Sequence, residues 1–220
     1  MSENVGQAVV AGVRDLLPAL RERAQEAEDA RVVPAESVKA LAETGFFRLL
    51  QPARFGGLEA DPLTFLTAVR LIASACGSTG WVGSVLGVHP WQLALFPLAA
   101  QEEVWGADAG TRMSSSYAPT GRAQAADGGH RLSGRWSFSS GSAHATWVLL
   151  GGIVTDAEGR PAESANTTSL VPNACTACGP GARNSPASPR QCQPRANLAG
   201  GGPAMMPRTP LRLVMEASTH

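Results

Sequence analysis

Apolar side chains recur at steps of three and four through the first part of the chain, which is the spacing of one helix face. The first series follows Ser2, a residue type that caps helices, and Pro18 within the series predicts a kink. The apolar positions of this series are Val9, Val13, Leu16, Leu20, Ala24 and Ala27. The pattern therefore predicts one kinked helix at the start of the chain.

Proline and glycine residues mark the boundaries of further predicted helices. Pro90 and Pro97 each predict a restart of the chain, because proline breaks a helix interior. The predicted helices run from Pro34 to Gly45, from Asp61-Pro62 to Gly77, over residues 79–88 and over residues 101–105. Residues 1–106 are accordingly predicted to be all-helical.

The pattern changes to two-residue alternation near Thr111, which is typical of strands. Strands are predicted over residues 112–117, 121–126, 130–139 and 145–154, with turns at residues 127–129 and 156–159. The alternation also predicts that Trp136 and Phe138 share one face of a strand, with Ser137 and Ser139 opposite. Helices followed by antiparallel strands predict an α+β fold.

Charge and composition divide the chain into unequal parts. Residues 1–163 hold 17 acidic and 13 basic side chains, whereas residues 164–220 hold one acid, five arginines, eight of the 16 prolines and no aromatic residue. Such a tail cannot build a core, so we expect it to be disordered. We predict an all-helical domain over residues 1–107, an incomplete middle β domain over residues 108–172 and a tail over residues 173–220. The composition change also suggests a frameshift near codons 163–173, which the nucleotide sequence tests.

The overall composition excludes several classes of protein. The 18 basic and 18 acidic residues give zero net charge and no basic footprint for nucleic acid. No apolar run reaches membrane-spanning length, and the N-terminus lacks the layout of a signal peptide. Four cysteines in 220 residues form no disulfide scaffold, which predicts a reducing, cytoplasmic location.

Six segments resemble one enzyme family. They are GFFRLLQPARFGG (45–57), ASACGSTGWV (73–82), GVHPWQLALF (87–96), QEEVWG (101–106), SSSYAPTG (114–121) and LSGRWSFSSGSAHATWV (132–148). Together they resemble the oxygenase component of two-component flavin monooxygenases built on the acyl-CoA dehydrogenase scaffold. The resemblance is strongest to the bacterial members that hydroxylate a phenolic secosteroid in steroid and cholesterol degradation, and it runs from about residue 5 to residue 163.

The resemblance implies a helical domain, a middle β-barrel domain and a C-terminal helical bundle, of which this sequence shows the first and part of the second. It implies reduced FMN supplied by a separate flavin reductase, with FAD as the alternative, and dioxygen as the co-substrate. The product would carry a new hydroxyl ortho to that of a phenol. The family bundle also supplies the base and the core of a homotetramer. Without this bundle, we do not expect the 220-residue chain to be a competent hydroxylase.

The resemblance also assigns site residues. Flavin contacts are expected at Trp81, Arg135, Trp136, Ser137 and Ser140, and substrate contacts at Tyr117 and Ser140. From the residues alone, the tryptophans are equally well explained as packing and the serines as a solvated strand face. No catalytic base is assigned, since the family base lies in the bundle, and neither His89 nor His144 replaces it.

Other motifs are weaker. Cys175 and Cys178 with Cys192 lack a fourth ligand for zinc, so no metal site is predicted. A second enzyme interpretation is an acyl-CoA dehydrogenase with FAD. The Thr-Glu-Pro signature of those enzymes is replaced here by Tyr117-Ala118-Pro119, which weakens it. A third interpretation is a non-catalytic fragment.

Overall fold

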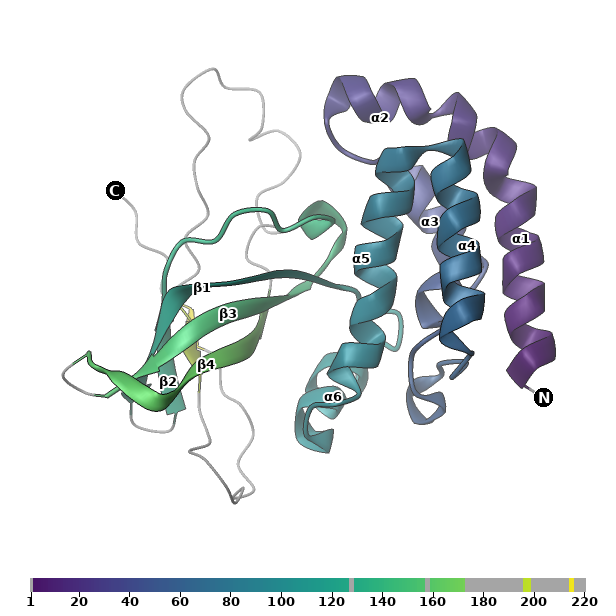
Figure 1. The fold of residues 1–220 in the computed structure, drawn as a ribbon. Coiled ribbons are helices and arrows are strands. Elements are labelled where there is room, and N and C mark those ends of the chain that lie inside the picture. Colours follow the sequence, from purple (N-terminus) through teal and green to yellow (C-terminus); the bar gives the residue numbers. More distant parts are fainter. Residues whose placement is uncertain (1, 127–128, 157–158, 173–195, 199–213, 216–220) are drawn as a thin grey trace. The chain divides into compact units, whose positions relative to one another are not determined.

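The computed structural model describes residues 2–126, 129–156, 159–172, 196–198 and 214–215 (Figure 1). The chain divides into two compact units, one formed by Met1–Ser114 with Ala143–Ala145 and the other by Ser115–Ser142 with Thr146–His220. The units therefore divide after Ser114, whereas the sequence placed its domain boundary after residue 107. Within the described residues, no helix combines the length and the apolar character that crossing a membrane requires.

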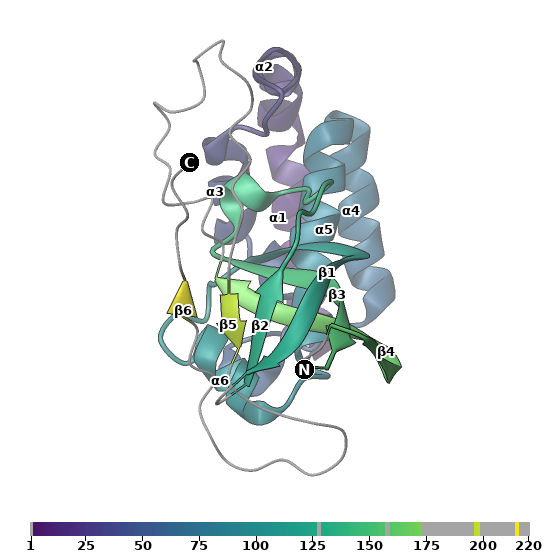
Figure 2. The ribbon, with the colours of Figure 1, turned by 90° about the vertical axis from the view of Figure 1, so that its left-hand side faces the viewer.

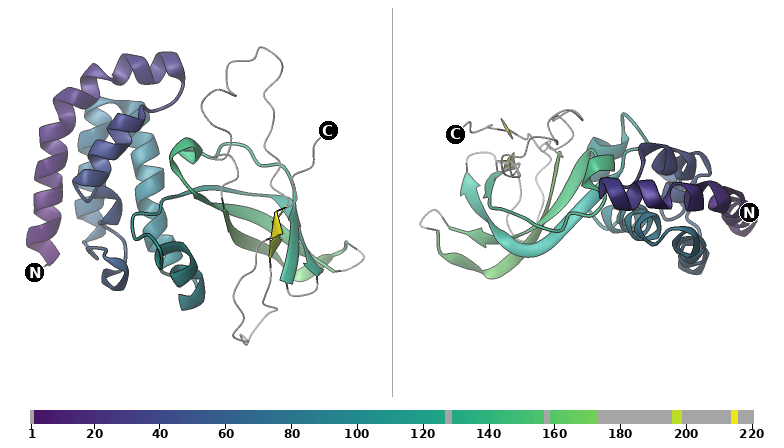
Figure 3. Two further views of the ribbon diagram at one scale, coloured as in Figure 1. Left: turned by 180° about the vertical axis from the view of Figure 1, so that it is seen from behind. Right: turned by 90° about the horizontal axis from the view of Figure 1, so that it is seen from above.

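The first unit consists of helices. They are α1 (Ser2–Glu22), α2 (Ala24–Ala30), α3 (Ala35–Glu43), α4 (Pro62–Ala75), α5 (Gly77–Leu93) and α6 (Leu98–Trp105), with short 3-10 turns at Phe46–Arg48 and Ala53–Phe55. Figure 3 shows α1, α3, α4 and α5 running alongside one another. The Asp61 side chain accepts a hydrogen bond of 2.7 Å from the Leu63 N–H and caps α4, as the Asp-Pro signal predicts. Gly45, with φ of 86°, ends the segment after α3.

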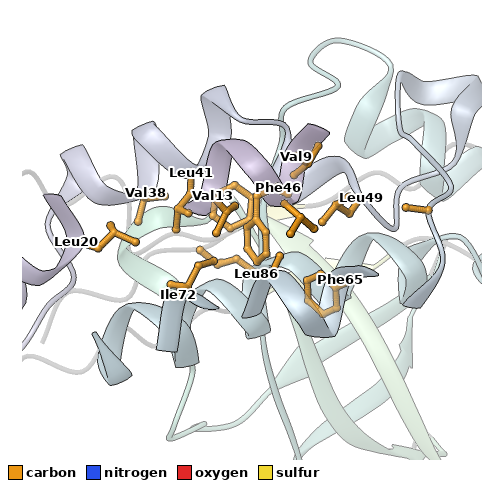
Figure 4. Close-up of a cluster of buried hydrophobic side chains, with 14 of the residues drawn as sticks. Val9, Val13, Leu20, Val38, Leu41, Phe46, Leu49, Phe65, Ile72 and Leu86 are labelled. Carbon is orange, nitrogen blue, oxygen red and sulfur yellow. The ribbon is translucent and has the colours of Figure 1, made fainter. Parts of the chain in front are cut away.

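The aromatic side chains of Phe46 and Phe65 lie in the first unit's core (Figure 4), and Phe47 belongs to the same buried cluster. The Phe46 ring is stacked on Phe65 with centroids 5.6 Å apart and meets Phe47 edge-on at 5.1 Å. A Cβ on Gly87 would lie 2.6 Å from the Phe65 ring, so glycine lets α5 approach α4 closely. The aliphatic side chains around them include Val9, Val13, Leu20, Val38, Leu41, Leu49, Ile72 and Leu86.

Several helix boundaries differ from the sequence prediction, and α6 begins at Leu98, three residues before the predicted start. The first predicted helix is two helices, because α1 runs through the exposed Pro18 and ends near Arg23, after which α2 begins. Pro90 does not restart the chain but lies inside α5. Proline lacks the N–H for one helical hydrogen bond. The buried side chains of Leu86, Pro90 and Leu93 on the packed face of α5 hold the helix direction past this defect.

The second unit contains a sheet with strand order β4-β3-β1-β2-β5-β6 (Figure 2), in which β2 pairs antiparallel with β1 and β5, β4 with β3, and β6 with β5. The long strands are β1 (Met113–Ala126), β2 (Gly129–Ser133), β3 (Trp147–Thr155) and β4 (Pro161–Pro172). The two strands predicted before residue 127 are thus one continuous strand. Ala126 pairs with Gly129, which places a tight hairpin turn at the predicted position, with residues 127–128 outside the described part. The Gly159 N–H donates to the Asp156 carbonyl at 3.0 Å, which confirms the second predicted turn.

The tail contributes two short strands to the sheet. These are β5 (Ala196–Leu198), which pairs with β2, and β6 (Val214–Met215), which pairs with β5. The prediction that residues 173–220 lack regular structure is therefore wrong for these five residues. The edge of β2 offers unpaired backbone groups to any extended chain, and such pairing needs no apolar pattern. The remaining tail, including its three cysteines, lies outside the described residues.

Candidate functional site

The candidate site lies in the loop formed by residues 134–146, between β2 and β3. The sequence predicted a strand to residue 139, but β2 ends at Ser133. Past that point the loop is joined to β1 by side-chain hydroxyls. The Thr120 Oγ1 donates to the Arg135 carbonyl at 3.0 Å, and the Ser116 Oγ donates to the Ser137 carbonyl at 2.7 Å. The loop therefore follows β1 without forming a regular strand pair.

Trp136 is seated in a notch made by glycines. A Cβ on Gly121 would overlap Cζ2 of the indole, and a Cβ on Gly134 would lie 2.9 Å from its Cη2. The indole Nε1–H donates a 2.7 Å hydrogen bond to the Gly151 carbonyl. The ring also packs against the sheet's own apolar cluster of Ala123, Leu132, Val148 and Leu150. The packing explanation of Trp136 is therefore correct for this ring, and a flavin contact at Trp136 stays a prediction.

Phe138 does not share the environment of Trp136. Its φ of 61° lies in the left-handed region, and its side chain is 98% exposed. The prediction that the two rings share a strand face is wrong, because the strand ends before them and the backbone turns at Phe138. Sequence reasoning therefore missed Phe138 as a displayed aromatic surface. Glycine at position 141 is the sequence signal that the strand does not continue, and the structure gives Gly141 a φ of 79°.

The loop displays several polar groups beside this ring. Arg135 and Ser137 have exposed side chains, whereas Ser140 is half-buried and already interacts with other residues. The Ser142 N–H donates to the Ser139 carbonyl at 3.2 Å and closes a turn around Ser140. On β1, Tyr117 is 45% exposed, and its carbonyl lies so close to Gly151 that no Cβ would fit there. The structure thus gathers five of the six predicted contacts in the second unit.

Trp81 is the sixth predicted contact and belongs to the first unit. It lies on α5 with 64% of its side chain exposed. Trp91 and Leu95 further along the chain are also exposed. The exposure of Trp81 departs from the interpretation of this residue as core packing, while its proximity to a flavin stays a prediction.

The two histidines have different surroundings. Burial lowers the pKa of His89 on α5 to about 4, so this imidazole is neutral at neutral pH. The His144 carbonyl accepts a 2.9 Å hydrogen bond from Arg112 Nε. The Arg112 guanidinium lies over the Phe47 ring at 5.8 Å from its centroid, and burial lowers its pKa against the opposing effect of Asp108. Neither histidine gains a feature that assigns it the role of base.

The groups on the loop are chemically suited to a flavin nucleotide. Arg135 offers a guanidinium, which is the preferred partner of a phosphate. Phe138 offers a flat apolar ring, and such rings stack on aromatic systems. Serine hydroxyls at residues 137, 139 and 140 can donate hydrogen bonds to ring nitrogen and oxygen atoms or accept them. The donor set therefore fits the cofactor that the sequence resemblance implies.

A helical unit followed by a β-sheet, with this loop between β2 and β3, is the arrangement of an acyl-CoA dehydrogenase-like scaffold. The sequence profile of the acyl-CoA dehydrogenase N-terminal domain matches residues 6–116, and the chain belongs to this family. The α+β fold predicted from the sequence is thereby confirmed.

Individual relatives refine this assignment. The chain is 62% identical over 148 residues to the flavin-dependent monooxygenase oxygenase subunit HsaA of Rhodococcus jostii, which covers 67% of this chain and 38% of the relative. It is 44% identical over 153 residues to the FADH2-dependent resorcinol hydroxylase oxygenase component of a Rhizobium species, which covers 69% and 37%. The crystal structure of the 3-HSA hydroxylase from Rhodococcus sp. RHA1 superposes with a TM-score of 0.72 at 57% identity, covering 76% of this chain and 42% of that one.

These relatives confirm the resemblance to oxygenase components of flavin-dependent monooxygenases. They are named for hydroxylation or monooxygenation, which supports that interpretation over an acyl-CoA dehydrogenase. The chain spans about two fifths of the length of the curated relatives that it matches, with 38% and 37% covered.

Proposed function

We propose that this chain forms the N-terminal part of the oxygenase component of a two-component flavin-dependent monooxygenase. The proposed substrate is a phenol, with a phenolic secosteroid as the first candidate, and the proposed reaction adds a hydroxyl ortho to the phenolic one. The proposal rests on the loop of residues 134–146. Its backbone accepts hydrogen bonds from β1 side chains, and the Arg135 and Phe138 side chains are exposed. The similarity to the Rhodococcus jostii subunit supports it.

Each loop residue has a proposed role. The exposed Phe138 ring packs against the flavin ring system, and Arg135 neutralises the phosphate. Ser137 and Ser140 hold the polar edge of the flavin by hydrogen bonds. Trp136 keeps the loop on the sheet through its bond to the Gly151 carbonyl. Tyr117, half-exposed on β1, lies beside the phenol together with Ser140.

The bound flavin, in its reduced form, supplies the activation of dioxygen. A separate flavin reductase delivers it. We propose FMN because Arg135 suits a terminal phosphate, although one relative is named for FADH2. We also propose a cytoplasmic location for the chain and its reductase. Trp81 on α5 is a further proposed flavin contact.

The experiment that tests the proposal is an anaerobic titration of the 220-residue chain with reduced FMN and, separately, reduced FAD. Binding of the reduced flavin is followed by its absorbance for the wild type and for Phe138→Ala, Arg135→Gln and the control Leu95→Ala, which removes an exposed apolar side chain from the first unit. We expect weak binding of FMN that Phe138→Ala and Arg135→Gln each reduce at least about fivefold, since both remove a direct contact. Equal binding by all four proteins, or none, contradicts the proposed role of the loop.

A further inference from the structure

Three side chains at a regular spacing hold the candidate loop to β1 and its start. They are Arg112, Ser116 and Thr120, four residues apart, and each donates a hydrogen bond to a backbone carbonyl of the loop. Thr120 reaches Arg135 at 3.0 Å, Ser116 reaches Ser137 at 2.7 Å, and Arg112 reaches His144 at 2.9 Å. Side chains an even number of residues apart leave a strand on the same side, so Ser116 and Thr120 share one side of β1, and Arg112 precedes the first residue of the strand.

The spacing of the acceptors is unequal. From Thr120 to Ser116 β1 advances four residues, and the loop advances only two, from Arg135 to Ser137. From Ser116 to Arg112 the chain again covers four residues, or about 13 Å when extended. The loop now uses seven residues, 137 to 144, which extended would reach about 23 Å. The surplus chain must leave the line of β1 between these two anchors.

The segment that leaves carries two of the proposed flavin contacts, Phe138 and Ser140. Residues 138–143 lie between the anchors at Ser137 and His144, and both left-handed backbone positions of the loop, Phe138 and Gly141, fall within it. A phenylalanine in this conformation is strained, and it persists only where the surroundings fix the backbone. The anchors at the two ends of the segment supply such constraints.

We propose that Ser116, Thr120 and Arg112 are positioning residues, which fix the backbone of residues 138–143 so that Phe138 and Ser140 are presented in one arrangement. The inference rests on the proposed flavin-binding function of this loop. Ser116 has the largest effect of the two hydroxyls, because its side chain is buried whereas Thr120 is exposed and water competes for its bond. Arg112 fixes the far end, where the neighbouring Ala145 is fully buried in the first unit's core.

Hydrogen exchange of the 220-residue chain tests the loop conformation directly. Ser116→Ala should raise the exchange rates of amides 138–142 at least about fivefold, and Thr120→Val should raise them less, while β3 amides keep their rates. Thr120→Ser should restore the wild-type rates, since it keeps the hydroxyl. Arg112→Lys, which moves the donor, should raise exchange at residues 143–145. The matched control is Thr67→Val, which removes the same kind of bond, from Thr67 to the Leu63 carbonyl on α4.

The titration with reduced FMN then separates positioning from stability. Ser116→Ala should weaken FMN binding at least about threefold without unfolding the chain, and Thr67→Val should leave it unchanged. If Ser116→Ala and Thr120→Val leave the exchange rates of the loop amides at the wild-type values, the inference is overturned. It is also overturned if these variants exchange faster but bind FMN with unchanged affinity. A wild-type chain that binds no flavin contradicts the proposed function alone, because the exchange rates still decide whether these residues fix the loop.

Discussion

The notch that holds Trp136 leads to a quantitative prediction at Gly121. An alanine Cβ at this position would overlap Cζ2 of the indole, so the Gly121→Ala protein must expel the ring. A half-buried indole that leaves its site exposes about 100 Å² of apolar surface, which costs about 2.5 kcal/mol. The lost hydrogen bond from Nε1 to the Gly151 carbonyl costs about 1 kcal/mol more. Alanine's lower backbone entropy returns about 0.5–1 kcal/mol. The expected loss of stability is therefore about 2.5–3 kcal/mol.

Gly152 provides the matched control on a neighbouring strand. A Cβ there would meet the Gly121 carbonyl at 3.4 Å and Leu132 Cδ1 at 3.5 Å, which are ordinary contacts. We expect Gly152→Ala to change stability by about 1 kcal/mol or less.

The assay is urea unfolding followed by circular dichroism, combined with NMR of the indole N–H signals. A second background, Trp136→Ala, should reduce the cost of Gly121→Ala to that of Gly152→Ala, because no ring is left to expel. A Gly121→Ala protein that is as stable as the wild type and keeps a protected Trp136 indole N–H would contradict the prediction that the Cβ expels the ring.

Three further predictions follow from other sites. Burial lowers the pKa of His89 to about 4, so the folded chain disfavours the charged imidazole, and the free energy of unfolding should fall as the pH drops from about 6.5 towards 4. Between pH 7.5 and 5, His89 should account for a loss of about 2 kcal/mol. In urea unfolding, the His89→Gln protein should therefore lose about 2 kcal/mol less than the wild type over this interval. Gln51 Nε2 donates to the Phe55 carbonyl at 2.8 Å and to the Ala109 carbonyl at 3.0 Å, and Gln51→Ala would leave both carbonyls without this donor. The substitution should therefore cost about 2–3 kcal/mol in the same assay, and a cost under about 0.5 kcal/mol would contradict the prediction. Ser140→Ala in a full-length relative should cost only about 0.5–1.5 kcal/mol in stability but reduce hydroxylation more steeply; unchanged turnover and hydrogen peroxide release would remove Ser140 from the site.

Local signals in the sequence predicted the elements whose boundaries depend on neighbouring residues alone. Asp61 before Pro62 caps α4, and the turns before Gly129 and Gly159 join strands as predicted. Pro90 was misjudged because the packed face of α5 outweighs one missing hydrogen bond. That choice depends on tertiary contacts, which no local pattern contains.

The sequence named the residues of the candidate site but not their geometry. Residues 135–140 were predicted to carry flavin contacts on a strand, and the structure places them in a loop after the end of β2. The alternation of Trp136 and Phe138 suggested a strand. The glycines that admit the indole lie at Gly121 on another strand and at Gly134, and only their approach in three dimensions shows why one ring is buried and the other is displayed.

The proposal that this chain provides the flavin-binding loop of a phenol hydroxylase is tested most directly by a chimera. Residues 5–163 replace the matching region of the Rhodococcus jostii relative, and ortho hydroxylation of a phenolic secosteroid is measured with reduced FMN and a flavin reductase. We expect hydroxylation coupled to reduced flavin consumption, and Phe138→Ala should lower that coupling at least about tenfold. A folded chimera that consumes reduced flavin and releases only hydrogen peroxide, or one in which Phe138→Ala changes nothing, would contradict it.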